Sequence, residues 1–234
     1  MLEQADRWWP KRVDAITLRV WLSSPIAWDS YDGVTIEGAL QCSVVMLETG
    51  LMPDDAFAGY RGPKVDIPIP IADVELDGSK VALASWAHPA PVALEEVRWR
   101  RRRVRIDAMG GASAILLNSG PFKATQLPTP TMSTPYLDFY LDADVERLRV
   151  LLADLGAIGR ARGGGLGTVL GCEILPRSGE VLVRDGRLTR TVPEGSVPNV
   201  DPSSYVARQA TLRAPYWHRG TLRDCWVPIL EAAA

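Results

Sequence analysis

The sequence predicts an α+β fold of the ferredoxin-like kind, in which an antiparallel sheet carries helices on one face. A strand pattern followed by a helix pattern occurs twice, at residues 15–50 and again at residues 136–159. Between them, residues 52–135 are rich in proline and in short β-like runs. Two strand-helix units separated by β-rich sequence are typical of such a sheet. With 234 residues, we expect one domain.

The first unit starts with AITLRVWL, residues 15–22, where apolar and other side chains alternate as in a half-buried strand. Residues 34–50 follow with an apolar stripe at helical spacing. Asp32 or Thr35 is available as the N-cap of this helix, and Gly50 as its terminator. The segment therefore predicts a strand followed by a helix.

The middle of the chain predicts hairpins and loops. Near its end, LPTPTMSTP, residues 127–135, repeats Thr and Pro so densely that we expect no regular structure there. The second unit follows, with a strand at residues 136–141, Asp142 or Asp144 as a helix cap, and a helix pattern over residues 145–159. After it, the sequence predicts a strand at 168–175 and a hairpin at 181–190 that turns at Asp185-Gly186.

The run VRWRRRRVRI, residues 97–106, carries six arginines. In an ideal strand its apolar face switches midway, which requires a bulge, a kink or an exposed hairpin arm. Like charges this close repel one another unless an anion lies alongside, so nucleic acid is favoured over a merely solvated face. Trp99 fits a base-stacking role, although a core or interface position is the commoner fate of tryptophan.

A second unusual stretch is AIGRARGGGLGTVLG, residues 157–171, with six glycines and two arginines. It lacks the Lys and hydroxyl of a phosphate-binding NTPase loop, and its spacing and its helix-to-strand context do not match a dinucleotide fingerprint. Bare backbone flanked by Arg160 and Arg162 suits a sugar-phosphate chain. A helix C-cap followed by a flexible turn explains the glycines equally well.

Composition narrows the function classes. The chain has 26 Lys and Arg against 28 Asp and Glu, so its net charge does not demand an acidic partner. Three distant cysteines indicate a reducing cytoplasm, and we expect no export segment, membrane span, zinc site or other cofactor. His88 and His218 are the only histidines, and His218, with arginines nearby, is the better candidate for catalysis.

Four stretches of the chain carry a family resemblance: LSSPIAWDSYDGVTIEGAL, YLDFYLDADVERLRVLL, IGRARGGGLGTV and APYWHRGTLRDCWVPI. Taken together, and in this order, they resemble the RAMP superfamily of CRISPR-associated proteins. More narrowly, they resemble the RAMP subunit of type IV effector complexes, which is similar to the subunit that holds the five-prime handle of the guide RNA in other types. Where relatives typically read Leu-Asp-Gly-Leu-Leu, this chain has Tyr-Asp-Gly-Val-Thr at 31–35.

The resemblance implies an RRM-like RAMP core at about 13–50 and 136–176, a β-rich thumb-like insertion at about 52–135, and a β-rich C-terminal extension at about 177–234. It implies a non-catalytic, cytoplasmic subunit that binds the five-prime handle of the crRNA and caps the backbone filament. Its implied partners are the backbone RAMP subunits and a large subunit. The residues expected to contact RNA are Arg160, Arg162, Gly163, Gly164, Gly165, Gly167, Lys123, Arg98, Trp99, Arg100, Arg101, Arg102, Arg103 and Arg105.

Two alternatives stay open. The first is a metal-independent endoribonuclease that processes repeat RNA, with His218 at its centre. The second is a structural assembly module that binds protein and no RNA.

Overall fold

The computed structural model describes residues 5–28, 33–51, 67–101, 126–160, 164–212 and 222–229. Across this part of the chain the architecture is α+β, as the sequence predicts, with two α-helices and mostly antiparallel strands. The helical elements are η1 (Ala5–Trp8), α1 (Glu37–Thr49), α3 (Val145–Leu152) and η5 (Pro202–Ser204). The strands are β1 (Asp14–Leu22), β2 (Ile26–Ala27), β3 (Asp73–Leu76), β4 (Ser79–Ala82), β5 (His88–Pro89), β6 (Leu94–Arg101), β7 (Gln126–Ser133), β8 (Tyr136–Ala143), β9 (Val169–Pro176), β10 (Val183–Arg184), β11 (Arg187–Leu188), β12 (Val192–Pro193), β13 (Tyr205–Ala210) and β14 (Arg223–Pro228).

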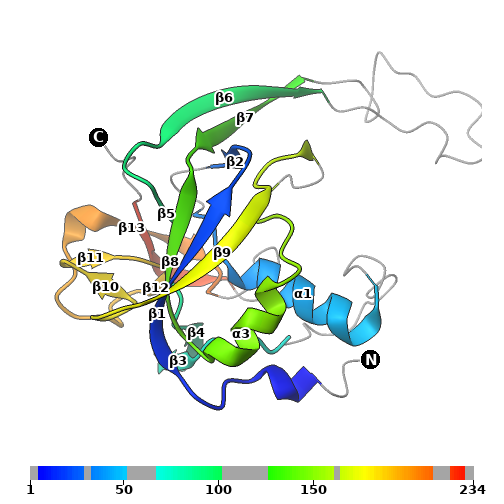
Figure 1. The fold of residues 1–234 in the computed structure, drawn as a ribbon. Helices are drawn as coiled ribbons and strands as arrows, with labels where there is room; N and C mark the ends of the chain where they lie inside the picture. Colours follow the sequence, from blue (N-terminus) through cyan, green and yellow to red (C-terminus); the bar gives the residue numbers. More distant parts are fainter. Residues whose placement is uncertain are drawn as a thin grey trace, which may run out of the picture.

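The central sheet has the strand order β5-β8-β1-β9, and every pairing in it is antiparallel. Figure 1 shows α1 and α3 on one side of β8, β1 and β9, and the strands of the C-terminal extension on the other side. Leu18 and Val20 of β1 and Phe139 of β8 are fully buried beneath the helices. The short strand β5 comes from within residues 52–135 and yet joins this sheet as its edge.

The helix ends agree with the sequence in part. Gly50 ends α1 in the left-handed conformation, and Asp144 caps α3 by accepting the N–H of Arg147. Thr35 does not cap α1, because the helix begins after Ile36 and has no side-chain cap; Asp32 lies outside the described residues. The helix expected over 145–159 ends at Leu152, because the backbone groups of residues 156–158 bond to residues 167–169 instead.

The expectation of an irregular segment at 127–135 is wrong, because β7 runs through residues 126–133 as a regular strand. It pairs with β6 in unbroken antiparallel register, with Pro130 opposite Val97 and Pro128 opposite Trp99. The Pro130 carbonyl accepts from Trp28 N–H on the edge facing away from β6. Both prolines place their ring nitrogens toward that edge, where the ladder with β6 requires no donor.

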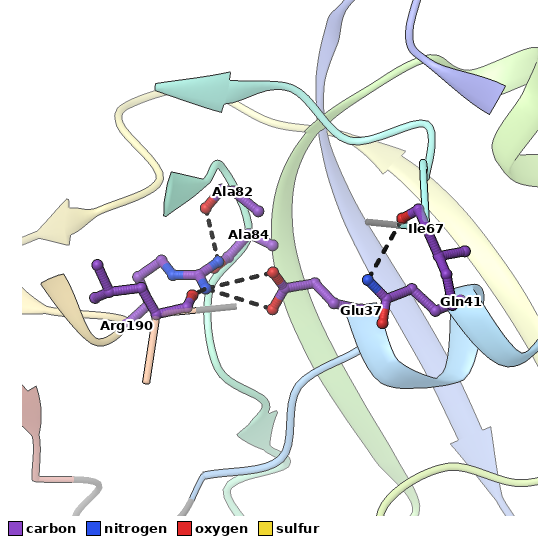
Figure 2. A network of polar contacts seen from close by, with 7 residues as sticks. Glu37, Gln41, Ile67, Ala82, Ala84 and Arg190 are labelled. Atoms are coloured by element: carbon purple, nitrogen blue, oxygen red, sulfur yellow. Dashed lines mark hydrogen bonds and ion pairs between the residues drawn. The ribbon is translucent and has the colours of Figure 1, made fainter. Parts of the chain in front are cut away.

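A buried polar cluster joins the C-terminal extension to the core (Figure 2). Arg190 is 1% exposed, and its guanidinium donates to the carbonyls of Ala82, Ala84 and Leu212 at 2.6, 2.8 and 2.9 Å. It also contacts both carboxylate oxygens of Glu37, in the first turn of α1, at 3.4 Å. We call these residues the Arg190 clasp; it links α1, the end of β4 and the extension.

Candidate nucleic-acid interface

The glycine-rich loop connects α3 to β9 and is fastened to the chain that leaves β1. The N–H of Gly167 donates to the carbonyl of Pro25 at 2.8 Å, and Thr168 N–H donates to Ser24 Oγ at 2.9 Å. Within the loop, Ile158 N–H donates to the Gly167 carbonyl at 2.9 Å. The ends of the loop are therefore held by main-chain bonds, and its position relative to β1 is defined.

Two glycines of the loop are required by the fold itself. A Cβ on Gly167 would lie 2.0 Å from the Ile158 carbonyl oxygen, and one on Gly159 would lie 2.9 Å from Ile26 Cδ1. Both residues also have positive φ, +67° and +76°. Gly167 is buried, so its missing side chain makes room for the loop's own backbone.

The exposed part of the loop holds the other described residues expected to meet RNA. Arg160, Gly164 and Gly165 are exposed. A Cβ on Gly165 would meet nothing within 4 Å, so bare backbone faces open space there. Arg162 and Gly163 lie outside the described residues, so Arg160 is the one member of the arginine pair whose position is described.

The second expected RNA-binding element is the hairpin of β6 and β7, which we call the arm; it extends away from the central sheet (Figure 1). Trp99 is 66% exposed, so it is not a core tryptophan. Arg98 is half exposed and lies 3.8 Å from Glu96 on the same face, which offsets part of its charge. Arg100 and Arg101 belong to β6, but their side chains are not described. Lys123, Arg102, Arg103 and Arg105 lie outside the described residues, as does the point where the apolar face switches.

The loop and the base of the arm meet across one segment, residues 22–28, which we call the Ser-Pro segment. On one side Ser24 and Pro25 hold the glycine-rich loop. On the other side β2 pairs with β7, with Ile26 opposite Met132. A shallow depression of about 330 Å³ lies at this junction. It is lined by Leu22, Ser23, Ser24, Pro25, Ser133, Thr134 and Pro135.

The face of the central sheet turned away from the helices carries a cluster that the sequence analysis did not single out. Arg19 makes a two-pronged ion pair with Asp138, at 2.8 and 2.9 Å. Its guanidinium carbon lies 3.9 Å from the Tyr136 ring centre, and Tyr136 meets Trp21 edge to face at 5.2 Å. The hydrogen bonds that Arg19 donates to Asp138 raise the pKa of Arg19. The available signal was the pair of large side chains, Arg19 and Trp21, on the non-core face of the first strand.

Farther along the same face, the C-terminal extension covers the sheet. Arg184 lies over the Tyr140 ring at 4.0 Å, and His88 packs against Tyr140 at 4.7 Å. Burial, together with the charge of Arg184, lowers the pKa of His88 to about 4. His88 is therefore a neutral, packed side chain at pH 7. His218, the histidine considered for catalysis, lies outside the described residues.

Residues 92–228 match the family model described as CRISPR type IV associated protein Csf3, which is more than half of the chain. The chain belongs to this family. The match runs from the approach to β6 to the end of β14 and so includes the arm, α3, the glycine-rich loop and the described strands of the extension. A comparison with curated proteins found no match.

Membership makes the chain a type IV CRISPR-associated component that assembles with other subunits. Within the described ranges no group of three or more acidic, cysteine or histidine side chains could hold a metal ion. None of the helices described is long and apolar enough to cross a bilayer.

Proposed function

We propose that this Csf3-family chain is a non-catalytic subunit of a type IV CRISPR effector complex that binds the guide RNA. It holds the five-prime handle of the crRNA at the glycine-rich loop and caps one end of the filament of backbone RAMP subunits, next to the large subunit. The observation that carries the proposal is the junction at the Ser-Pro segment. The glycine-rich loop and the base of the arm that carries the arginine run are both attached there, within seven residues of chain.

The proposal includes a ferredoxin-like, RRM-like core. Its support is the sheet order β5-β8-β1-β9, with α1 following β1 and α3 joining β8 to β9. This is the order expected when two strand-helix units interleave, so that β1 and β8 become the two central strands. The arm then corresponds to the thumb-like insertion of a RAMP protein, and residues after Pro176 to the C-terminal extension.

The chemistry of the junction suits a sugar-phosphate backbone. Exposed Gly164 and Gly165 leave main-chain groups approachable, and Arg160 adds a cation at the same loop. Ser24 and Thr134 use their hydroxyls for main-chain bonds, whereas the exposed Ser23 beside the depression offers a neutral hydroxyl to phosphate or ribose. Since the net charge is -2, the isolated chain should bind RNA weakly, and its partners should supply the remaining affinity.

The test is to change Arg160 and Arg162 together to Ala and to measure handle-RNA retention by the assembled complex over a range of salt concentrations. We expect weaker retention and a salt slope smaller by about 2, because two phosphate contacts are lost. Arg12→Ala is the matched control, since Arg12 is 83% exposed and lies just before β1, at the end of that strand opposite to the Ser-Pro segment. Unaltered retention in the double variant would show that the loop does not bind the handle.

The same preparation distinguishes the nuclease alternative. Labelled repeat RNA is incubated with the wild-type chain in EDTA and separated on native and denaturing gels. We expect intact RNA. A discrete cleavage product that disappears in His218→Ala would instead identify a processing endoribonuclease. A complex that assembles fully after nuclease treatment and without RNA would identify a protein-only assembly module.

A further inference from the structure

The face of the central sheet turned away from the helices carries, at the end that Arg184 does not cover, an aromatic surface that the glycine-rich loop and the arm do not account for. On β1 and β8 every second side chain is buried under the helices, and the alternating positions point the other way. At the end of the sheet where β1 leaves it, those positions are held by Arg19, Trp21, Tyr136 and Asp138. We call these four residues the platform.

The platform is held in place by its own contacts. Asp138 accepts hydrogen bonds from two nitrogens of Arg19. The guanidinium carbon lies 3.9 Å from the centre of the Tyr136 ring, and Tyr136 and Trp21 meet edge to face. A cross-strand pair alone would explain why the two aromatic residues are neighbours. It does not explain why Trp21 keeps 37% of its surface exposed while its neighbours are fastened around it.

The sheet beside Trp21 is open on its other flank. Its partner on β9 is Gly171, and a Cβ there would meet nothing within 4 Å. The preceding residue, Leu170, lies at a register shift in the β1–β9 pairing and is 71% exposed. Trp21 therefore has an exposed ring beside a strand position without a side chain, which leaves room for a planar group to stack.

We propose that this platform stacks a base of single-stranded RNA on Trp21. The proposal rests on the RNA-binding function proposed above and adds the site that receives a base. Its position supports an RNA occupant: Trp21 directly precedes the Ser-Pro segment, Tyr136 directly follows the depression, and the glycine-rich loop runs into β9 two residues before Gly171. RNA whose backbone lies at the loop therefore has a stacking surface beside it.

The charges predict how this site differs from the loop. Asp138 already neutralises Arg19, so the platform offers a ring face and no free cation for phosphate. Stacking on an aromatic side chain is tolerant of base identity and contributes little to the salt dependence, whereas arginine contacts to phosphate determine it. Loss of the platform should weaken binding at constant salt slope, and loss of the loop arginines should lower the slope.

The experiment uses the full chain assembled with its complex and a guide RNA that carries 4-thiouridine at successive positions in its five-prime segment. Trp21→Leu keeps an apolar side chain but removes the ring, and Trp21→Phe keeps a ring. We expect the wild type to cross-link at one position to the tryptic peptide 20–61, which contains Trp21. Trp21→Leu should lose that cross-link and bind RNA about 5- to 150-fold more weakly, the contribution of one stacked base. Trp21→Phe should retain most of both.

The outcomes separate this proposal from the one on which it rests. If the wild-type complex holds RNA through Arg160 and Arg162 while Trp21→Leu binds with unchanged affinity, the platform proposal is wrong and the handle-binding function stands. If the wild-type complex assembles but the chain makes no contact with RNA, both are wrong. If Trp21→Leu prevents assembly without RNA, the surface contacts another subunit, and the platform proposal is again wrong.

Discussion

The Arg190 clasp makes a stability prediction that can be worked out from its contacts. Arg190→Met removes three hydrogen bonds to carbonyl oxygens, at 2.6 to 2.9 Å, and the charge facing Glu37. Both charged side chains are almost completely buried, at 1% and 2% exposure. Removing one partner of such a pair costs about 3–5 kcal/mol, because the remaining polar groups stay buried without their donor.

The assay is equilibrium unfolding in urea. With a slope of about 2 kcal/mol per molar urea, the midpoint should fall by about 1.5–2.5 M. Glu37→Gln should cost less than Arg190→Met, because the contacts to Glu37, at 3.4 Å, are longer than those to the carbonyls. The matched control is Arg12→Ala: Arg12 is 83% exposed and pairs with Asp14, so the loss should stay below about 1 kcal/mol.

The result that would refute this reasoning is a cost for Arg190→Met of about 1 kcal/mol or less, equal to that of the exposed pair. The double variant Arg190→Met with Glu37→Leu adds a second check. Its destabilisation should be smaller than the sum of the two single changes, because the second change removes a charge that the first left unpaired.

Three further predictions follow from single residues. Gly167→Ala should lower the free energy of unfolding in urea by more than about 2 kcal/mol, because the positive φ and the Ile158 carbonyl both oppose a Cβ. Gly171→Ala, the control, should change it by less than about 0.5 kcal/mol. Equal effects of the two changes would contradict the loop geometry. Burial lowers the pKa of His88 from 6.5 to about 4. Between these two pH values the unfolded chain binds a proton at His88 that the folded chain does not bind. The contribution of His88 to stability is therefore complete above pH 6.5 and is lost as the pH falls toward 4. Relative to His88→Gln, the wild type should therefore lose about 2–3 kcal/mol between pH 7 and 4.5, and parallel pH profiles would refute this. Burial opposes the charge of Asp144, but the backbone N–H groups of Lys11, Arg147 and Arg12 hold its pKa below the usual value. Asp144→Ala should cost about 2 kcal/mol of stability and lower Tm by about 4–8 °C. An unchanged Tm would exclude the cap.

The arm shows where sequence reasoning succeeded and where it stopped. The arginine-rich run requires a bulge, a kink or an exposed hairpin arm, and residues 94–99 of β6 are exposed in a hairpin with β7. Its partner strand, rich in Thr and Pro, is not predicted. Proline content argues against a strand in general, but β2 pairs with β7 only at residues 131 and 132, so at Pro128 and Pro130 the ladder needs donors on the β6 side only. Which side the prolines occupy depends on the pairing partner, and that partner is set by the tertiary fold.

By itself, the sequence determined the α+β class, the strand-helix order, the Gly50 helix end and the Asp185-Gly186 turn, and it limited the cap of the second helix to Asp142 or Asp144. Each depends on residues within one or two turns of chain, so local periodicity and capping chemistry suffice. The clasp between Arg190 and Glu37 and the platform on β1 and β8 were decided only by the tertiary structure. Their members lie more than a hundred residues apart, and only the register and packing of the folded chain bring such groups together.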